Sequence, residues 1–353
     1  MIYEEKKEVK MGIKLTPKEN FLKVIHKEIP QSIPQGLMGF KGYNGERCYA
    51  IVGPSILDET HLVPMTTHVD AFGLKWITNP ESMSGLIPDV SNPILKDVTK
   101  WRDVIKTPDL SGIDWEIVAK KDIEKSGIND ETEARMVTIG LMPFQEFVGF
   151  MGFAEGLMAM YEEPDYVKEL LNWMADIYMP VIKASIDYYK PDAAYLLDDT
   201  AARYNPFFSE EMYVEFMKPV YTKLTKPYVD AGIPLEYHNC GRCEDFYKHA
   251  VEFGVVVTDP VQVENDVMNV KKTFGRNLAI AGGTSFPTLP KSFPKVDRDE
   301  IREDLHRVLD PLAKDGGFLA FGSYSAIDTD LKELNAAMAE EMYNFCQLYY
   351  EKN

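Results

Sequence analysis

Short runs of β-branched and apolar residues alternate with longer amphipathic stretches along almost the whole chain. Such alternation is typical of a parallel α/β fold, because parallel strands need a long crossover and a helix supplies it. Two helices are predicted most clearly, one over Pro164–Tyr189 and one that follows Ser209 and ends at Gly232. The predicted strands are Cys48–Val52, Met136–Leu141, Ala193–Leu197, Leu235–Cys240, Val255–Thr258, Leu278–Ala281 and Phe318–Phe321, with an eighth near Gly36–Phe40.

Seven or eight strands joined by helices fit a (β/α)8 (TIM) barrel better than an open dinucleotide-binding sheet. No GxGxxG follows an early strand, and no GxxxxGK followed by Ser or Thr occurs. A chain of 353 residues could also form two smaller domains, but glycine and proline are spread along it rather than gathered in a linker. We therefore expect residues 1–353 to form a single (β/α)8 barrel domain with an N-terminal helical extension.

Polar residues follow several predicted strands at the end where the active sites of TIM barrels lie. Asp and Ser also cap helices, so each position has a purely structural interpretation. Their coincidence at four strand ends is harder to explain in that way, and it favours a functional site. The residues are Asp198 and Asp199, the segment from His238 to Cys240, Asp259, and Ser323 with its neighbours.

The segment 236–243 (EYHNCGRC) carries the strongest chemical signal in the chain. Side chains alternate along a strand, so Glu236, His238 and Cys240 face the same side. An imidazole and a thiolate two residues apart on one face can both reach a single zinc ion, at bond lengths of roughly 2.0–2.3 Å. Cys243 follows closely enough to serve as a further ligand. The alternative is a buried histidine beside two small apolar cysteines, but the clustering of two of the four cysteines favours a metal site.

Cysteine usage and charge narrow the expected location and partners. Cys48 and Cys346 stand alone near opposite ends of the chain, which is no disulfide framework. The start (MIYEEKKEVKMGIKL) has no apolar signal-peptide core, and no run is long enough to cross a bilayer. We therefore expect a cytoplasmic protein. The net charge of −18 argues against nucleic acid and anionic membranes, although it can also reflect only a solvated surface.

Several short motifs are spread almost from end to end of the chain. The most specific is the tetrapeptide HNCG at 238–241, and looser ones are found at 70–76, 151–158, 198–199, 259–262 and 281–283. Through these motifs the chain resembles the uroporphyrinogen decarboxylase superfamily, and within it the zinc-dependent, corrinoid-linked methyltransferases. The tetrapeptide looks like the His-x-Cys-Gly metal motif of that family.

The resemblance implies a uroporphyrinogen decarboxylase-like TIM barrel with Zn2+ held by His238 and Cys240. It also implies a corrinoid carried by a separate protein, and no Asp-x-His-x-x-Gly cobalamin-binding segment occurs in this chain. The methyltransferases that use coenzyme M have a further zinc-binding cysteine at the last strand, where this chain has Ser323. The third ligand is then Cys243, which we favour, or absent, or a carboxylate such as Glu236, Asp259 or Glu264.

A second departure concerns the substrate. The decarboxylases of the superfamily carry an arginine-rich N-terminal loop that grips the carboxylates of the porphyrinogen, whereas residues 33–40 contain no arginine. A substrate with many carboxylates would have no partner there, which disfavours porphyrinogen decarboxylation.

The methyltransferase interpretation assigns roles to further residues. Asp198 and Asp199 are the predicted catalytic carboxylates, and Gln262 would orient the substrate or support the metal ligands. Met142, Phe144 and Phe147 follow a predicted strand, and such side chains suit a flat apolar ring, although plain core packing is at least as common for each of them.

The predicted reaction is transfer of a methyl group between a small donor and the cobalt of a corrinoid protein. A methoxylated aromatic is the favoured donor, so that the reaction is an O-demethylation. The alternatives are a methylcorrinoid:thiol methyltransferase of the coenzyme M type, a uroporphyrinogen decarboxylase-like enzyme acting on a smaller substrate, and a binding protein without turnover.

Overall fold

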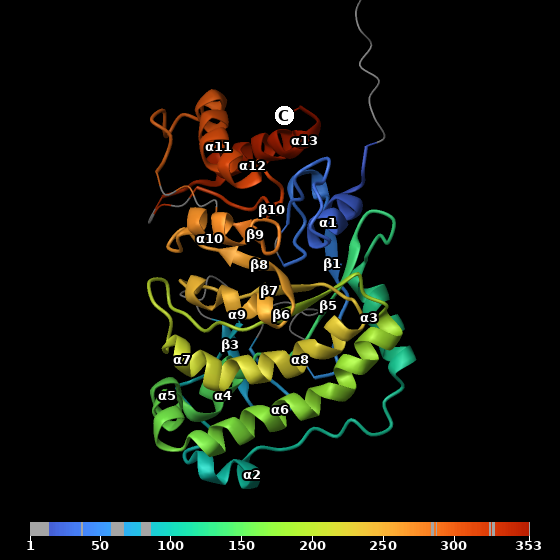
Figure 1. Ribbon diagram of the computed structural model, residues 1–353, viewed down its shortest axis with the longest axis vertical. Helices are drawn as coiled ribbons and strands as arrows, with labels where there is room; N and C mark the ends of the chain where they lie inside the picture. The colour runs from blue at the N-terminus through green and yellow to red at the C-terminus, as the bar shows by residue number, and fades with distance from the viewer. Residues whose placement is uncertain are drawn as a thin grey trace, which may run out of the picture.

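The computed structural model describes residues 14–36, 38–57, 67–78, 86–283, 286, 288–324, 326 and 329–352. Its central element is a seven-stranded parallel sheet in the order β1-β5-β6-β7-β8-β9-β10 (Figure 1). The strands are β1 (Tyr49–Ile51), β5 (Ala134–Thr138), β6 (Ala193–Leu197), β7 (Leu235–His238), β8 (Val255–Val261), β9 (Ala279–Gly282) and β10 (Phe318–Leu319).

The sheet is curled, as shown by one hydrophobic cluster to which both its first and its last strand contribute. Tyr49 of β1 and Leu319 of β10 pack in this cluster together with Tyr195 of β6, and helix α1 (Pro17–Ile25) covers it with Phe21. Alternate residues of the same strands belong to a second, larger cluster shared with the outer helices. The period-two alternation of the strands thus separates an inner core from an outer one.

All seven strands predicted outside the range Gly36–Phe40 are present, with ends shifted by a few residues. The eighth predicted strand does not form in the described residues of that range. Instead, Gln35 makes a single parallel bridge with Ala320, just beyond β10. Met38 has a φ of +52°, which is incompatible with the extended backbone of a strand, and Leu37 lies outside the described residues.

The two predicted helices are confirmed. Helix α6 (Pro164–Ala184) continues into a π-helical turn that ends at Tyr189. The second begins after Ser209, whose hydroxyl accepts a hydrogen bond from the Met212 backbone N–H and so caps the first turn. It consists of α7 (Glu210–Met212), a π-helical turn and α8 (Lys218–Asp230).

The remaining helices surround the sheet or extend from it (Figure 1). They are α2 (Trp101–Val104), α3 (Trp115–Ser126), α4 (Pro143–Met151), α5 (Phe153–Glu162), α9 (Tyr247–Glu252), α10 (Val267–Phe274), α11 (Arg298–Ala313), α12 (Lys332–Cys346) and α13 (Tyr349–Lys352). None of the helices in the described residues is long and apolar enough to cross a membrane.

A small antiparallel sheet lies between β1 and β5 in the chain and was not predicted. Its strands are β2 (His68–Val69), β3 (Lys75–Thr78) and β4 (Leu86–Pro88). Strands of two to four residues are too short to show the alternation by which strands are recognised in a sequence.

Candidate metal centre

Three side chains from two neighbouring strand ends bring ligand atoms together. Strands β6 and β7 pair in parallel with Leu197 opposite His238, so that Asp199 and Cys240 both lie two residues further on. The Cys240 Sγ lies 3.4 Å from His238 Nε2, and Asp199 Oδ1 lies 3.9 Å from the same nitrogen. The backbone N–H of Cys240 donates to Asp199 Oδ1 at 2.7 Å, which ties the two strand ends together.

This donor set fits a zinc ion. The ligand atoms of Asp199, His238 and Cys240 all lie within 4.8 Å of one another. A tetrahedral zinc ion with bonds of about 2.0–2.3 Å separates its ligand atoms by roughly 3.3–3.8 Å, close to the distances between the three side chains. Thiolate, imidazole and carboxylate are the three types of side chain that zinc binds in proteins, and three protein ligands leave one position open.

The orientation of the His238 ring is determined by buried partners behind it. His238 Nδ1 lies 3.2 Å from Asp259 Oδ1 and 3.2 Å from the Tyr195 hydroxyl oxygen. Because the Tyr195 hydroxyl donates its proton to Asp259 Oδ2 at 2.6 Å, its oxygen can only accept from the imidazole. In the neutral imidazole Nδ1 is therefore the protonated nitrogen, and the lone pair of Nε2 is directed to Cys240 and Asp199.

Burial and neighbouring carboxylates shift the pKa values of His238 and Cys240. Burial alone would lower the pKa of His238, but Asp259 and the Cys240 thiolate raise it well above its ordinary value overall. Burial and then Asp199 raise the pKa of Cys240, while His238 opposes this. A divalent cation would displace these protons, because it binds the thiolate and the neutral imidazole.

Glu236 lies on the same face of β7 as His238, as predicted, but deeper in the inner core. Its side chain is 1% exposed and accepts a hydrogen bond from the Tyr49 hydroxyl at 3.2 Å. Burial and the adjacent Asp259 raise the pKa of Glu236 well above its ordinary value. Glu264, another alternative ligand, pairs instead with Arg203 at 2.6 Å.

The structure does not bring Cys243 together with the other candidate ligands. Its Sγ contacts the Asn239 carbonyl oxygen at 3.2 Å and the Tyr247 hydroxyl at 3.4 Å. The thiol is fully buried, and burial raises its pKa to about 12. The reason is the turn at Gly241, where a φ of +91° reverses the chain and carries Cys243 into the outer core.

Two polar side chains hold this turn from the following strand and loop. The Gln262 side-chain oxygen accepts a hydrogen bond from the Gly241 backbone N–H. Asn265 accepts from the backbone N–H of Cys243 at 3.0 Å and donates to the Gly241 carbonyl at 3.0 Å. The structure thus places Gln262, predicted to orient the substrate or support the ligands, beside the turn that follows Cys240.

Asp198 faces away from the candidate ligands and caps helix α4. Its carboxylate accepts hydrogen bonds from the backbone N–H groups of Phe144 at 2.7 Å and Gln145 at 3.1 Å, and from the Tyr221 hydroxyl at 2.8 Å. Burial raises the pKa of Asp198 to about 7, and these three donors oppose a larger rise. A carboxylate at a helix N-terminus also interacts favourably with the helix dipole. Asp198 therefore attaches α4 to the end of β6.

The apolar residues predicted to bind the substrate lie in α4 or directly before it. Phe144 and Phe147 are each 1% exposed, and the Phe144 ring stacks on Phe207 at a centroid distance of 5.7 Å. Phe153 completes this aromatic cluster and is 36% exposed. Met142 is partly buried against both the inner and the outer core and lines a small cavity.

Sequence reasoning missed two side chains that support the site. Tyr195 orients His238. The alternation along β6 could have identified it, because Tyr195, Leu197 and Asp199 are spaced by two residues and so share a face. The Gln145 side-chain N–H donates to Asp199 Oδ2 at 3.0 Å, and no pattern in the sequence indicates this contact. Asp199 itself was predicted as a catalytic carboxylate rather than as a ligand.

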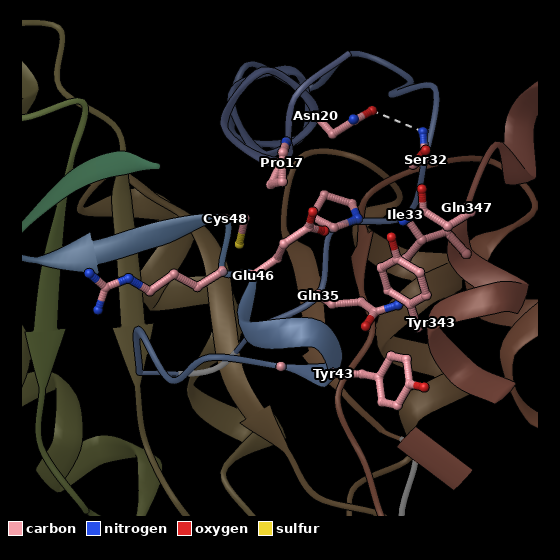
Figure 2. Close-up of a pocket in the computed structure, with 13 residues that line it drawn as sticks. Pro17, Asn20, Ser32, Ile33, Gln35, Tyr43, Glu46, Cys48, Tyr343 and Gln347 are labelled. Carbon is pink, nitrogen blue, oxygen red and sulfur yellow. Dashed lines mark hydrogen bonds between the residues drawn. The ribbon is translucent and has the colours of Figure 1, made fainter. Parts of the chain in front are cut away.

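A separate cavity lies at the other end of the strands (Figure 2). Figure 2 shows the thiol of Cys48 and the carboxylate of Glu46 on one side of it, with Tyr343 and Gln347 on the other. Cys48 precedes β1, whereas His238 ends β7, and parallel strands all begin at the same edge of a sheet. This cavity is therefore remote from the three candidate ligands.

The chain is similar to known proteins both in sequence and in fold. Residues 62–341 match the family model described as Uroporphyrinogen decarboxylase (URO-D). Among solved structures, the fold is similar to that of a methyltransferase from Methanosarcina mazei, with a TM-score of 0.57 and 14% sequence identity over 93% of this chain and 99% of the other. At this identity the likeness is one of fold. No curated protein sequence matches the chain.

Replacing Asp198 by Ala should destabilise the protein by at least about 3 kcal/mol, because three buried donors lose their only common acceptor. The Tyr221→Phe variant removes one of these hydrogen bonds and should cost about 1 kcal/mol. The free energy of unfolding from urea titration measures both. Equal losses in the two variants would contradict the capping role.

Replacing Gly241 by Ala should destabilise the protein by at least about 3 kcal/mol, since a Cβ would lie 2.5 Å from the Ala202 carbonyl oxygen at a φ unfavourable for L-residues. Gly232→Ala is the matched control: its φ is +72°, and a Cβ there would meet nothing within 4 Å. That variant should lose only about 1 kcal/mol. Urea titration compares the two, and a similar loss in both would show that the close approach at Gly241 is unimportant.

Proposed function

This chain belongs to the uroporphyrinogen decarboxylase family, and we propose that it is a zinc-dependent methyltransferase that exchanges a methyl group with a corrinoid protein. The observation that carries the proposal is the convergence of Asp199, His238 and Cys240 at neighbouring strand ends. The likeness in fold to a methyltransferase supports the class of reaction. The corrinoid would be carried by a partner protein, and the methyl donor would be a small molecule.

The residues around the site have distinct roles in this proposal. Asp199, His238 and Cys240 would hold the zinc ion, which would supply a Lewis acid with an open position. Asp259 and Tyr195 keep the imidazole in the tautomer that binds a metal. Cys243 is not proposed as a ligand, because its thiol is engaged in the outer core.

The apolar side chains of α4 and α5 support an apolar donor. Met142 is partly buried at the start of α4, and Phe153 is the exposed member of the aromatic cluster. Phe144 and Phe147 are buried and would support the side chains of Met142 and Phe153. Because Met and aromatic side chains suit a flat ring, we retain a methoxylated aromatic as the donor and O-demethylation as the reaction.

The proposal includes a closed barrel in a single domain. Gln35 bridges to Ala320 beyond β10, and a Cβ on Gly39 would lie 3.3 Å from the Ile51 backbone nitrogen of β1. The segment that contains Gln35 and Gly39 therefore reaches both edges of the curled sheet, which supports a (β/α)8 arrangement. The four cysteines are all free thiols, which supports a reducing, cytoplasmic location.

Porphyrinogen decarboxylation is less compatible with the charges in this chain. The first arginine after the arginine-free segment 33–40 is Arg47, whose guanidinium pairs with Glu133 at 3.0 Å and donates to the Ser126 carbonyl at 3.2 Å. Arg203, which follows β6, pairs with Glu264. Neither guanidinium is available to grip a substrate carboxylate without losing its present partner.

The protein purified without chelator should contain about one zinc per chain. His238→Ala and Cys240→Ala should each lower the zinc affinity by more than about 100-fold, because losing a ligand costs more than losing a supporting side chain. Cys243→Ala is the matched control and should keep its zinc. Elemental analysis and competition with a chromophoric chelator measure this. Full zinc content in Cys240→Ala, or zinc loss in Cys243→Ala, would contradict the ligand assignment.

Anaerobic incubation of the protein with cob(I)alamin and methoxylated aromatics should produce methylcobalamin. The absorbance of methylcobalamin measures the transfer. His238→Ala should abolish the transfer rather than only raise the KM, because the charge that the metal stabilises develops in the transition state. A panel of methylamines tests the choice of donor. Transfer only from methylcobalamin to a thiol would support the coenzyme M type instead. Formation of coproporphyrinogen and CO2 from added uroporphyrinogen would exclude the methyltransferase.

A further inference from the structure

The two adjacent carboxylates after β6 both bind the first turn of helix α4, but through different groups. Asp198 binds the backbone N–H groups of Phe144 and Gln145. Asp199 binds the side chain of Gln145, whose Nε2 lies 3.0 Å from Asp199 Oδ2. The Gln145 side chain therefore starts from a backbone that Asp198 already holds in place, and it reaches Asp199 as a second contact between α4 and β6.

The two oxygens of Asp199 have different partners. Oδ1 accepts from the Cys240 backbone N–H at 2.7 Å and lies 3.9 Å from His238 Nε2. Oδ2 accepts from Gln145. Oδ1 is thus the oxygen that contacts the segment of the other two candidate ligands. An amide is a suitable donor for Oδ2, because it fixes the carboxylate without neutralising the negative charge that a cation needs.

We propose that Gln145 is a positioning residue that keeps Asp199 a one-oxygen ligand and thereby keeps a coordination position free for the substrate. This inference rests on the proposed zinc site. A carboxylate that is free to rotate can bind a metal through both oxygens, which would occupy the position that a catalytic zinc site leaves open. Gln145 prevents this rotation by holding Oδ2 on the side of α4.

The test is made on the protein with Co2+ in place of Zn2+, because the visible bands of cobalt depend on its coordination. Four-coordinate cobalt absorbs strongly and cobalt with more ligands absorbs weakly, and thiolate ligation adds a charge-transfer band. The wild type should show the strong bands. Gln145→Met keeps the side-chain volume but removes the donor, so it should weaken the visible bands and lower the zinc affinity about 10- to 100-fold.

Gln35→Ala is the matched control, because its amide donates to the Met342 carbonyl at 3.2 Å in the remote cavity. It should leave both the bands and the affinity unchanged. Gln145→Asn, whose shorter amide cannot reach Asp199, should reproduce Gln145→Met and serves in its place if that variant does not fold. A melting curve of each apoprotein checks folding.

A double-mutant cycle separates positioning from a general structural effect. Asp199→Ala should itself lower the zinc affinity, and adding Gln145→Met to it should cause no further loss. A wild type without bound cobalt or zinc would reject the proposed metal site. Bands and affinity that are unchanged in Gln145→Met, or a full further loss in the double variant, would overturn the role of Gln145 alone.

Discussion

The buried carboxylate of Asp259 is the constraint on which the site depends. It lies on the inner face of the curled sheet, where its side chain has no exposure and where Glu236, Tyr195 and His238 are its polar neighbours. A buried carboxylate must be hydrogen-bonded or paired, and here Tyr195 and His238 supply the partners. Turning the imidazole would break the contact with Asp259. The contacts that satisfy the buried Asp259 carboxylate therefore also direct His238 Nε2 toward the strand end.

The site is built by residues that alternate along two strands in register. Leu197 pairs with His238, so Asp199 and Cys240 lie opposite each other two residues further on. The backbone N–H of Cys240 therefore donates to the Asp199 carboxylate. Asp198 and Asp199 are neighbours and extend in different directions, one toward the first turn of α4 and one toward the ligands. The position of the helix and that of the ligand are therefore coupled.

The parts of the fold that depend on local periodicity could be predicted from the sequence. Alternation located seven strands and placed His238 and Cys240 on one face. The direction of Cys243 could not be predicted, because it depends on the positive φ of Gly241 and on contacts with a distant Asn265. The proximity of Asp199 to Cys240 depends on the register between strands that are separated by helix α8, which no local pattern encodes.

The charges of the three candidate ligands explain how a carboxylate that follows β6 can replace the second cysteine ligand, which the coenzyme M enzymes carry at the last strand. One thiolate, one carboxylate and a neutral imidazole carry two negative charges, which balance a zinc ion as two thiolates and an imidazole would. An oxygen ligand is harder than a thiolate and gives less electron density to the metal. A zinc ion held by Asp199, His238 and Cys240 would therefore remain the stronger Lewis acid. That property suits the polarisation of an ether oxygen better than the stabilisation of a soft thiolate acceptor.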